Sequence, residues 1–216
     1  MLFRSTHFAG FLGHIQRKEK IGPSGVAMAP FDTELFGHWW FEGVDFLKEL
    51  FARLPYREGV VAVTASEHLD SFPPQAAIRP LQGSWGASGD FSMWLNEDTR
   101  WTWERLWPLE DTFWEIAPGA LASEETRTIL AHAARQLLLA QSSDWQFMIS
   151  TGAVPDYAEK RLNLHCDDAE VLLDALKPGA PEGAVAEALE KVLALQARDN
   201  IFPNILESVE EILNRS

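Results

Sequence analysis

The stretch Val26–Trp40, VAMAPFDTELFGHWW, decides the expected fold of this chain of 216 residues. It begins with a continuous apolar run, VAMAPF, which is typical of a strand buried on both faces of a parallel sheet. Asp32 follows directly, at the C-terminal end of that expected strand. Side chains at this end of parallel strands face the ligand-binding edge of α/β folds, because the loops converge there. Asp32 is therefore a candidate catalytic carboxylate, and the alternative that it only caps the following helix stays open.

Helical and apolar segments alternate on either side of this stretch. Apolar residues at helical spacing predict helices over residues 5–19 and 44–54. Residues 59–66, GVVAVTAS, have the continuous apolar character of a second buried strand. Strands that alternate with helices pair in parallel. Since two strands cannot form a stable parallel sheet by themselves, we expect this part of the chain to be the end of a larger α/β unit.

The second part of the chain has an almost entirely helical pattern. Apolar spacing predicts helices over residues 99–117, 123–150, 154–176, 182–199 and 208–215. A loop-like region comes before them and ends in a segment rich in glycine and tryptophan, residues 81–98. The expected domains are therefore 1–80, the α/β part, and 81–216, a helical domain in which 81–98 is a substrate loop.

Tryptophan is concentrated in one region, because seven of the nine tryptophans fall between Trp39 and Trp107. Trp85 and Trp94 stand among small, flexible residues of the loop, where an indole ring can approach a ligand closely. The flat face of an indole stacks on sugar rings and other flat ligands, while its N–H binds a polar group. Trp85 and Trp94 are therefore candidate binding residues. The tryptophans of the helical segment that follows favour core packing instead: Trp101, Trp103, Trp107 and Trp114.

Asp144 stands out because it continues an apolar stripe of the expected helix 123–150. A carboxylate on a buried stripe needs an ion pair, hydrogen bonds or a polar cavity, since an isolated buried charge is very costly. Two alternatives stay open, a structural ion pair and an acid that faces a ligand.

Composition excludes several classes of function. The formal net charge of −14 argues against a surface that neutralises phosphates, so no nucleic-acid partner is expected. The single cysteine, Cys166, rules out an internal disulfide framework, and no Cys/His spacing indicates a zinc site. No metal or cofactor is expected. The apolar runs are too short to span a membrane and no leader pattern is visible, so we expect a cytoplasmic protein without a membrane partner.

Four motifs together resemble one known family. APFDTELFGHWWFEG, GSWG, GDFSMWLNEDTRWTWERL and LLLAQSSDWQFMI occur in the order found in the C-terminal part of glycoside hydrolase family 57, specifically in its 1,4-α-glucan branching enzyme group. The resemblance covers about residues 5–170. It implies that residues 1–80 are the last strands and helices of an incomplete (β/α)7 barrel and that a mostly α-helical domain follows.

The resemblance also implies roles for the four candidate residues. Asp32 is the implied general acid/base, Trp85 and Trp94 line the implied glucan cleft, and Asp144 is an implied substrate-binding residue. The implied reaction moves an α-1,4-glucan chain onto a 6-hydroxyl group with retention of configuration, through two carboxyl groups about 5 Å apart. An α-glucan is therefore the expected partner.

The second carboxyl group is absent from the matching motifs, because the nucleophile of this family is a glutamate on an earlier strand. Nothing in the sequence places Glu34, Glu67 or Asp90 as a substitute. We therefore expect the isolated chain to be inactive. Three alternatives stay open: a 4-α-glucanotransferase or α-amylase of the same family, a non-catalytic glucan-binding module, and a subunit of a split enzyme whose N-terminal barrel is a separately encoded chain.

Overall fold

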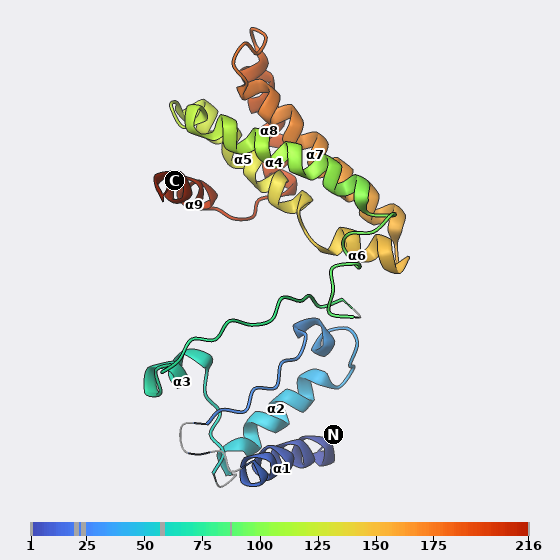
Figure 1. Cartoon of the computed structure of the whole chain (residues 1–216), viewed down its shortest axis with the longest axis vertical. Coiled ribbons are helices and arrows are strands. Elements are labelled where there is room, and N and C mark those ends of the chain that lie inside the picture. Colours follow the sequence, from blue (N-terminus) through green and yellow to red (C-terminus); the bar gives the residue numbers. More distant parts are fainter. Residues whose placement is uncertain (1, 20–21, 23–24, 57–58, 87, 216) are drawn as a thin grey trace. The chain divides into compact units, whose positions relative to one another are not determined.

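The chain folds into two compact units, Met1–Pro80 and Leu81–Ser216, which are called unit 1 and unit 2 below (Figure 1). The structure is a computed structural model, and it describes residues 2–19, 22, 25–56, 59–86 and 88–215.

Unit 1 is a small helical assembly around a pair of packed helices. Its elements are α1 (Leu2–Lys18), η1 (Thr33–Phe36), α2 (Gly43–Arg53), η2 (Leu54–Tyr56) and α3 (Ala65–Ser71). The described core of this unit contains Ala9 of α1 together with Phe46, Leu50 and Leu54, so α1 and α2 bury apolar faces against each other. Trp40 closes one end of this core, because its ring lies 4.7 Å from the ring of Phe46, measured between centroids.

The two expected strands are not formed in the described residues, so the expectation of an α/β start is wrong for this structure. The backbone of residues 25–32 and 60–63 has neither strand nor helix structure. The apolar side chains expected to be buried there are exposed, for example Met28 at 78% and Val61 at 80%. A segment becomes a strand only when neighbouring strands accept and donate its backbone hydrogen bonds, and the described residues supply no such neighbours.

Helix α3 begins at Ala65, inside the expected strand 59–66, and continues to Ser71, within residues 67–98 where we expected a loop. Thr64 and Glu67 form a capping box at its start: the Thr64 hydroxyl accepts from the Glu67 amide at 3.2 Å, and the Glu67 carboxylate accepts from the Thr64 amide at 2.8 Å.

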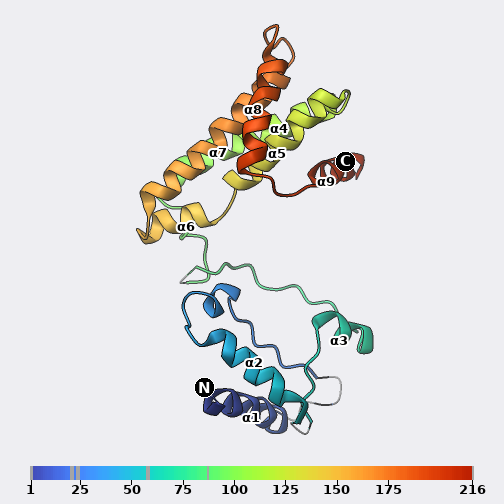
Figure 2. The same ribbon diagram turned by 180° about the vertical axis from the view of Figure 1, so that it is seen from behind.

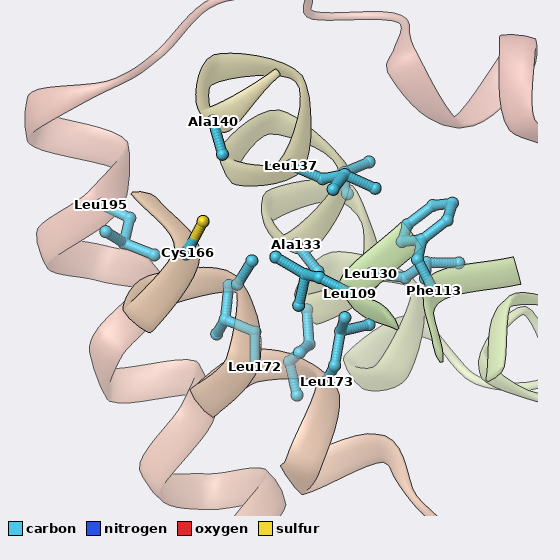
Figure 3. Packing of buried hydrophobic residues seen from close by; sticks show 14 of the residues in the cluster. Leu109, Phe113, Leu130, Ala133, Leu137, Ala140, Cys166, Leu172, Leu173 and Leu195 are labelled. Carbon is cyan, nitrogen blue, oxygen red and sulfur yellow. The ribbon is translucent and has the colours of Figure 1, made fainter. Parts of the chain in front are cut away.

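Unit 2 is helical throughout its regular structure. Its helices are α4 (Arg100–Ala120), α5 (Glu124–Ala140), α6 (Asp144–Thr151), α7 (Pro155–Leu176), α8 (Ala184–Arg198) and α9 (Ile205–Arg215). Helices α4, α5, α7 and α8 lie side by side in both views (Figure 1, Figure 2). Helix α5 is at the centre of the packing, since every residue from Ile129 to Leu137 is buried. Around it, Phe113 of α4, Cys166 and Leu172 of α7 and Leu195 of α8 complete the core (Figure 3).

The expected helix over 123–150 is divided into two helices. Helix α5 ends at Ala140 and α6 begins at Asp144, with the polar residues Gln141, Ser142 and Ser143 between them. Serine and aspartate side chains compete for backbone hydrogen bonds and favour helix ends over helix interiors. Asp144 is therefore the exposed first residue of α6 rather than a carboxylate on a buried stripe, and the buried-stripe prediction is wrong.

A buried polar network connects α5, α7 and α8 inside unit 2. His165 donates from Nδ1 to Gln136 Oε1 at 2.7 Å, and Gln136 donates from Nε2 to Asp199 Oδ2 at 3.1 Å. The Arg198 guanidinium donates to both Asp199 and Asp168, at 2.6 Å and 2.5 Å. Because polar groups inside a core must be hydrogen-bonded, this network fixes the relative placement of the three helices.

Candidate functional site

An open groove with a volume of about 500 Å³ lies on unit 2, and its lining is mostly aromatic. The groove is lined by Ser84, Trp85, Phe91, Trp94, Leu95, Trp103, Trp107 and Ser143. This set combines the glycine-rich loop, the first turns of α4 and the turn between α5 and α6. Its volume lies within the range of roughly 300–1,000 Å³ that is typical of small-molecule sites.

A tight turn that contains Gly86 and Gly89 holds Trp85 at the edge of this groove. The Ser84 amide donates to the Gly89 carbonyl at 2.9 Å, and the Gly89 amide donates to the Gly86 carbonyl at 2.8 Å. Gly89 has a φ of +70°, which other residues adopt only with strain. Gly86 is buried, and a Cβ there would lie 2.8 Å from the Asp90 carbonyl oxygen. The chain therefore needs glycine at both positions to form this turn.

Trp85 presents most of its indole to solvent, since 74% of the residue is exposed. One side of the ring is supported by Phe147 of α6 in an edge-to-face contact, with a distance of 5.5 Å between ring centroids. A supported but exposed indole offers a flat apolar surface with a defined orientation.

Trp94 is held from two sides. Its Nε1 donates to the Ser143 carbonyl at 3.1 Å, while its own carbonyl oxygen accepts from Trp103 Nε1 at 2.7 Å and from the Thr99 hydroxyl at 2.9 Å. The N–H groups of Trp94 and Trp103 are thus bonded within the protein. What these two rings contribute to the groove is their apolar surface rather than a hydrogen-bond donor.

A second group of hydrogen bonds fixes the segment around Trp94 to α6. Asn96 donates from Nδ2 to the Ser150 hydroxyl at 2.8 Å, and Ser150 donates to the Met93 carbonyl at 2.6 Å. The hydroxyl of Thr99 accepts from the Asn96 amide at 3.0 Å. Sites need support of this kind if they are to keep a precise geometry.

The structure brings Trp85 and Trp94 together in one groove and adds two tryptophans that we had assigned to the core. Trp103 is partly buried, but Trp107 is 54% exposed, and both line the groove. Their rings lie 5.8 Å apart between centroids. The spacing of four residues places Trp103 and Trp107 on one face of α4. The neighbouring Glu104 is exposed, and this charged residue was the signal in the sequence that the face is not fully covered.

Asp144 lies beside the groove-lining residue Ser143 in sequence and is exposed. Its carboxylate accepts a hydrogen bond from the Ser142 hydroxyl at 2.8 Å. A carboxylate in the first turn of a helix is favoured by the helix dipole, so the charge needs no buried partner. Of the two alternatives left by the sequence, the structural ion pair is not formed with any residue that the structure describes.

Asp32 is an exposed residue of unit 1 and precedes η1. Its side chain makes no capping hydrogen bond, although its carbonyl oxygen accepts from the Leu35 amide at 3.2 Å. The alternative that this carboxylate serves to cap the following helix is therefore wrong.

Two other carboxylates near the motifs have structural roles. The Glu67 carboxylate accepts hydrogen bonds from the amide and the hydroxyl of Thr64, which lower its pKa. The hydroxyl and the amide of Ser92 lower the pKa of Asp90 in the same way. These bonds stabilise a helix start and a turn.

The part of the chain that the structure describes contains no group of three or more His, Cys, Asp or Glu side chains that could hold a metal ion. Within the same residues, none of the helices is sufficiently long and apolar to cross a membrane.

Comparison with known proteins identifies the relatives of this chain. Residues 108–209 match the family model of the 1,4-alpha-glucan branching enzyme C-terminal domain. The 1,4-alpha-glucan branching enzyme of Thermococcus kodakarensis is 38% identical over 206 residues, which are 92% of this chain and 30% of that enzyme. A structure of that enzyme, solved in complex with glucose and additives, superposes with a TM-score of 0.78.

Two other solved structures have the same fold over nearly all of the chain. The GH57-type branching enzyme of Pyrococcus horikoshii has a TM-score of 0.79 and 33% identity, and the match covers 93% of this chain and 38% of that one. The alpha-amylase AmyC of Thermotoga maritima has a TM-score of 0.68 and 31% identity, with 94% and 38% covered.

This chain spans about a third of the length of each of these proteins. The match runs through both units, since it covers more than nine-tenths of the residues. In sequence and fold, the chain therefore corresponds to a C-terminal portion of the GH57 branching enzymes.

Proposed function

We propose that this chain is the C-terminal part of a retaining 1,4-α-glucan branching enzyme and that the groove of unit 2 binds the glucan. The observation that carries the proposal is the groove itself, in which Trp85 and Trp94 supply rigid aromatic surfaces. Aromatic faces suit the apolar faces of sugar rings. The net charge of −14 favours a neutral polymer over an anionic one. The related Thermococcus enzyme was solved with glucose, the unit of such a polymer.

In the proposed chemistry, Asp32 transfers protons and Asp144 binds the substrate. Asp32 protonates the oxygen of the leaving glucan chain and later removes the proton from the 6-hydroxyl of the acceptor, so that a branch rather than a free end forms. Asp144, at the start of α6, hydrogen-bonds sugar hydroxyl groups. The first step needs a second carboxylate, which bonds to the anomeric carbon as the leaving glucan chain departs with the proton from Asp32. In the second step the 6-hydroxyl oxygen bonds to the anomeric carbon and displaces this carboxylate.

We assign this second carboxylate to polypeptide outside the 216 residues, either in the same protein or in a separately encoded chain. The extended apolar runs of unit 1 support this assignment. Val26, Ala27 and Val61 line one hollow of about 230 Å³ together with Leu12 of α1. Unpaired extended segments with exposed apolar side chains favour pairing with a further strand. We expect that strand to come from the polypeptide that carries the second carboxylate.

The likeness to the Thermotoga alpha-amylase supports a second candidate, hydrolysis or linear transfer of the same polymer. The two functions differ in their product. A branching enzyme creates α-1,6 bonds without lowering the number of glucose units in polymer, whereas an amylase releases short linear chains.

The test mixes this chain with a polypeptide that consists of the part of the Thermococcus kodakarensis enzyme to which this chain does not align. We expect amylose incubated with both polypeptides to gain α-1,6 bonds, measured as chains released by a debranching enzyme, and amylose incubated with either one alone to gain none. Asp32→Asn is the matched control, since it keeps the shape of the side chain and removes the acid. Branch formation that persists with Asp32→Asn, or branch formation by the 216 residues alone, would contradict the proposal.

A further inference from the structure

We propose that Trp107 and Trp103 form a second stacking platform, which extends the glucan site along α4 beyond Trp85 and Trp94. This inference rests on the proposed function, because it concerns the length of glucan that the same groove holds. Trp107 is the residue on which the proposal depends, since it is 54% exposed and still belongs to the lining of the groove.

The two indoles of α4 form a continuous surface. Their ring centroids are 5.8 Å apart and their planes differ by 36°, so the rings are tilted side by side. Trp103 is fixed by its hydrogen bond to the Trp94 carbonyl, at 2.7 Å. Trp107 therefore lies next to a ring whose position is fixed, and the platform is formed before any ligand arrives.

The occupant is a linear α-glucan rather than a single sugar. The groove of about 500 Å³ contains four tryptophans from two segments, which is more aromatic surface than one glucose ring covers. Trp85 belongs to the loop, whereas Trp103 and Trp107 belong to α4. Separate platforms that bind successive units of one chain raise affinity through effective concentration, because the second contact is intramolecular.

The groove carries no charged side chain among its lining residues, which fits a neutral ligand. The polar residues that border the rings are Ser84 and Ser143. The Ser84 hydroxyl donates to the Asp90 carbonyl and accepts from the Gly86 amide at 3.0 Å, so the Ser143 hydroxyl is the one that suits a hydroxyl of a sugar.

Calorimetric titration of the full 216-residue chain with maltotriose and with maltoheptaose tests this inference. The quantity of interest is the preference for the longer ligand, the ratio of the two dissociation constants. We expect Trp107→Leu to weaken maltoheptaose binding by about ten-fold and to leave maltotriose binding nearly unchanged, so that the preference falls. Trp107→Phe, which keeps a flat ring, restores most of the preference.

Leu193→Ala is the matched control, because Leu193 is an exposed apolar residue of α8 outside the groove, and it leaves both affinities unchanged. Far-UV circular dichroism verifies that every variant is folded. Unchanged affinities in Trp107→Leu, or equal losses for both ligands, overturn the second platform. If Trp85→Ala nevertheless weakens the binding of both ligands, the proposed glucan binding by the groove still stands. No binding of either ligand by the unmodified chain overturns both.

Discussion

Acidification from pH 7 to pH 5 is expected to lower the free energy of unfolding of unit 2 by about 2 kcal/mol through His132 of α5. This side chain is almost completely buried, with 1% of the residue exposed. Arg135 Nη1 donates to its Nε2 at 3.0 Å, so the neutral ring carries its proton on Nδ1. Burial, followed by the positive charge of Arg135, lowers the pKa of His132 from 6.5 to about 4, while Asp199 opposes this shift.

The direction of the effect follows from the proton balance. Below pH 6.5 the unfolded chain binds a proton at this histidine, whereas the folded chain does not bind one until about pH 4. The stabilisation is therefore complete above pH 6.5 and decreases as the pH falls toward 4. A shift of one pKa unit corresponds to about 1.4 kcal/mol, and pH 5 lies about 1.5 units below the unfolded pKa, which gives about 2 kcal/mol. Burial also lowers the pKa of His165, so His165 adds a loss of the same sign.

Urea unfolding monitored by far-UV circular dichroism at pH 7, 6 and 5 measures this loss. In His132→Gln, a side chain that accepts from Arg135 without titrating, the loss between pH 7 and pH 5 shrinks by about 2 kcal/mol. Leu193→Ala provides the control, since it replaces an exposed side chain of α8 that does not titrate and leaves the pH dependence unchanged. Equal stability of the unmodified protein at pH 7 and pH 5, or an unchanged loss in His132→Gln, would show that His132 does not cause the loss of stability on acidification.

Three further substitutions test the groove turn, the buried polar network and the apolar core of unit 2. Gly86→Ala brings a Cβ to 2.8 Å from a backbone carbonyl, so we expect maltoheptaose affinity to fall by about five-fold or more in calorimetry, with little change in the unfolding of the helices. Asp168→Ala removes the buried partner of Lys191 and one of the two buried partners of Arg198, which keeps Asp199. Because Arg198 also keeps 39% of its side chain exposed, we expect a loss of about 2 kcal/mol in urea unfolding rather than the larger cost of a fully buried pair. Leu162→Ala removes a side chain that is fully buried and is expected to cost about 2–5 kcal/mol, visible as a lower Tm in calorimetric scans.

The helices could be predicted from the sequence because they bury their apolar faces within the chain. The spacing of apolar residues predicted helices at 5–19, 44–54 and 154–176, and α1, α2 and α7 are found there. The break at residues 141–143 was missed because the apolar period continues across it, while the decisive signal is the preference of serine and aspartate for helix ends.

The strands could not be judged from the sequence in the same way. An apolar run such as VAMAPF indicates that a segment is buried by something, but a strand also needs hydrogen-bonding neighbours. In this structure Met28 is exposed instead of buried, because the described residues do not supply those neighbours.

The groove residues that lie in the loop could be predicted from their sequence neighbours. Trp85 and Trp94 stand in a loop of small residues, and both line the groove. Trp107 was missed because tryptophans in a helical segment favour core packing, and the nearby Glu104 was a weak signal for an exposed face. The exposure of Trp107 depends on which neighbours pack against α4, and that is a property of the tertiary structure.

The indole N–H resonances of the nine tryptophans report directly whether the groove of unit 2 binds the glucan. In a two-dimensional ¹H–¹⁵N spectrum recorded with increasing maltoheptaose, we expect shifts of the signals of Trp85, Trp94, Trp103 and Trp107. The signal of Trp145, whose N–H is bonded to the Leu139 carbonyl at 2.7 Å in the core, stays unchanged. A spectrum without shifts, or shifts confined to tryptophans outside the groove, would contradict the account.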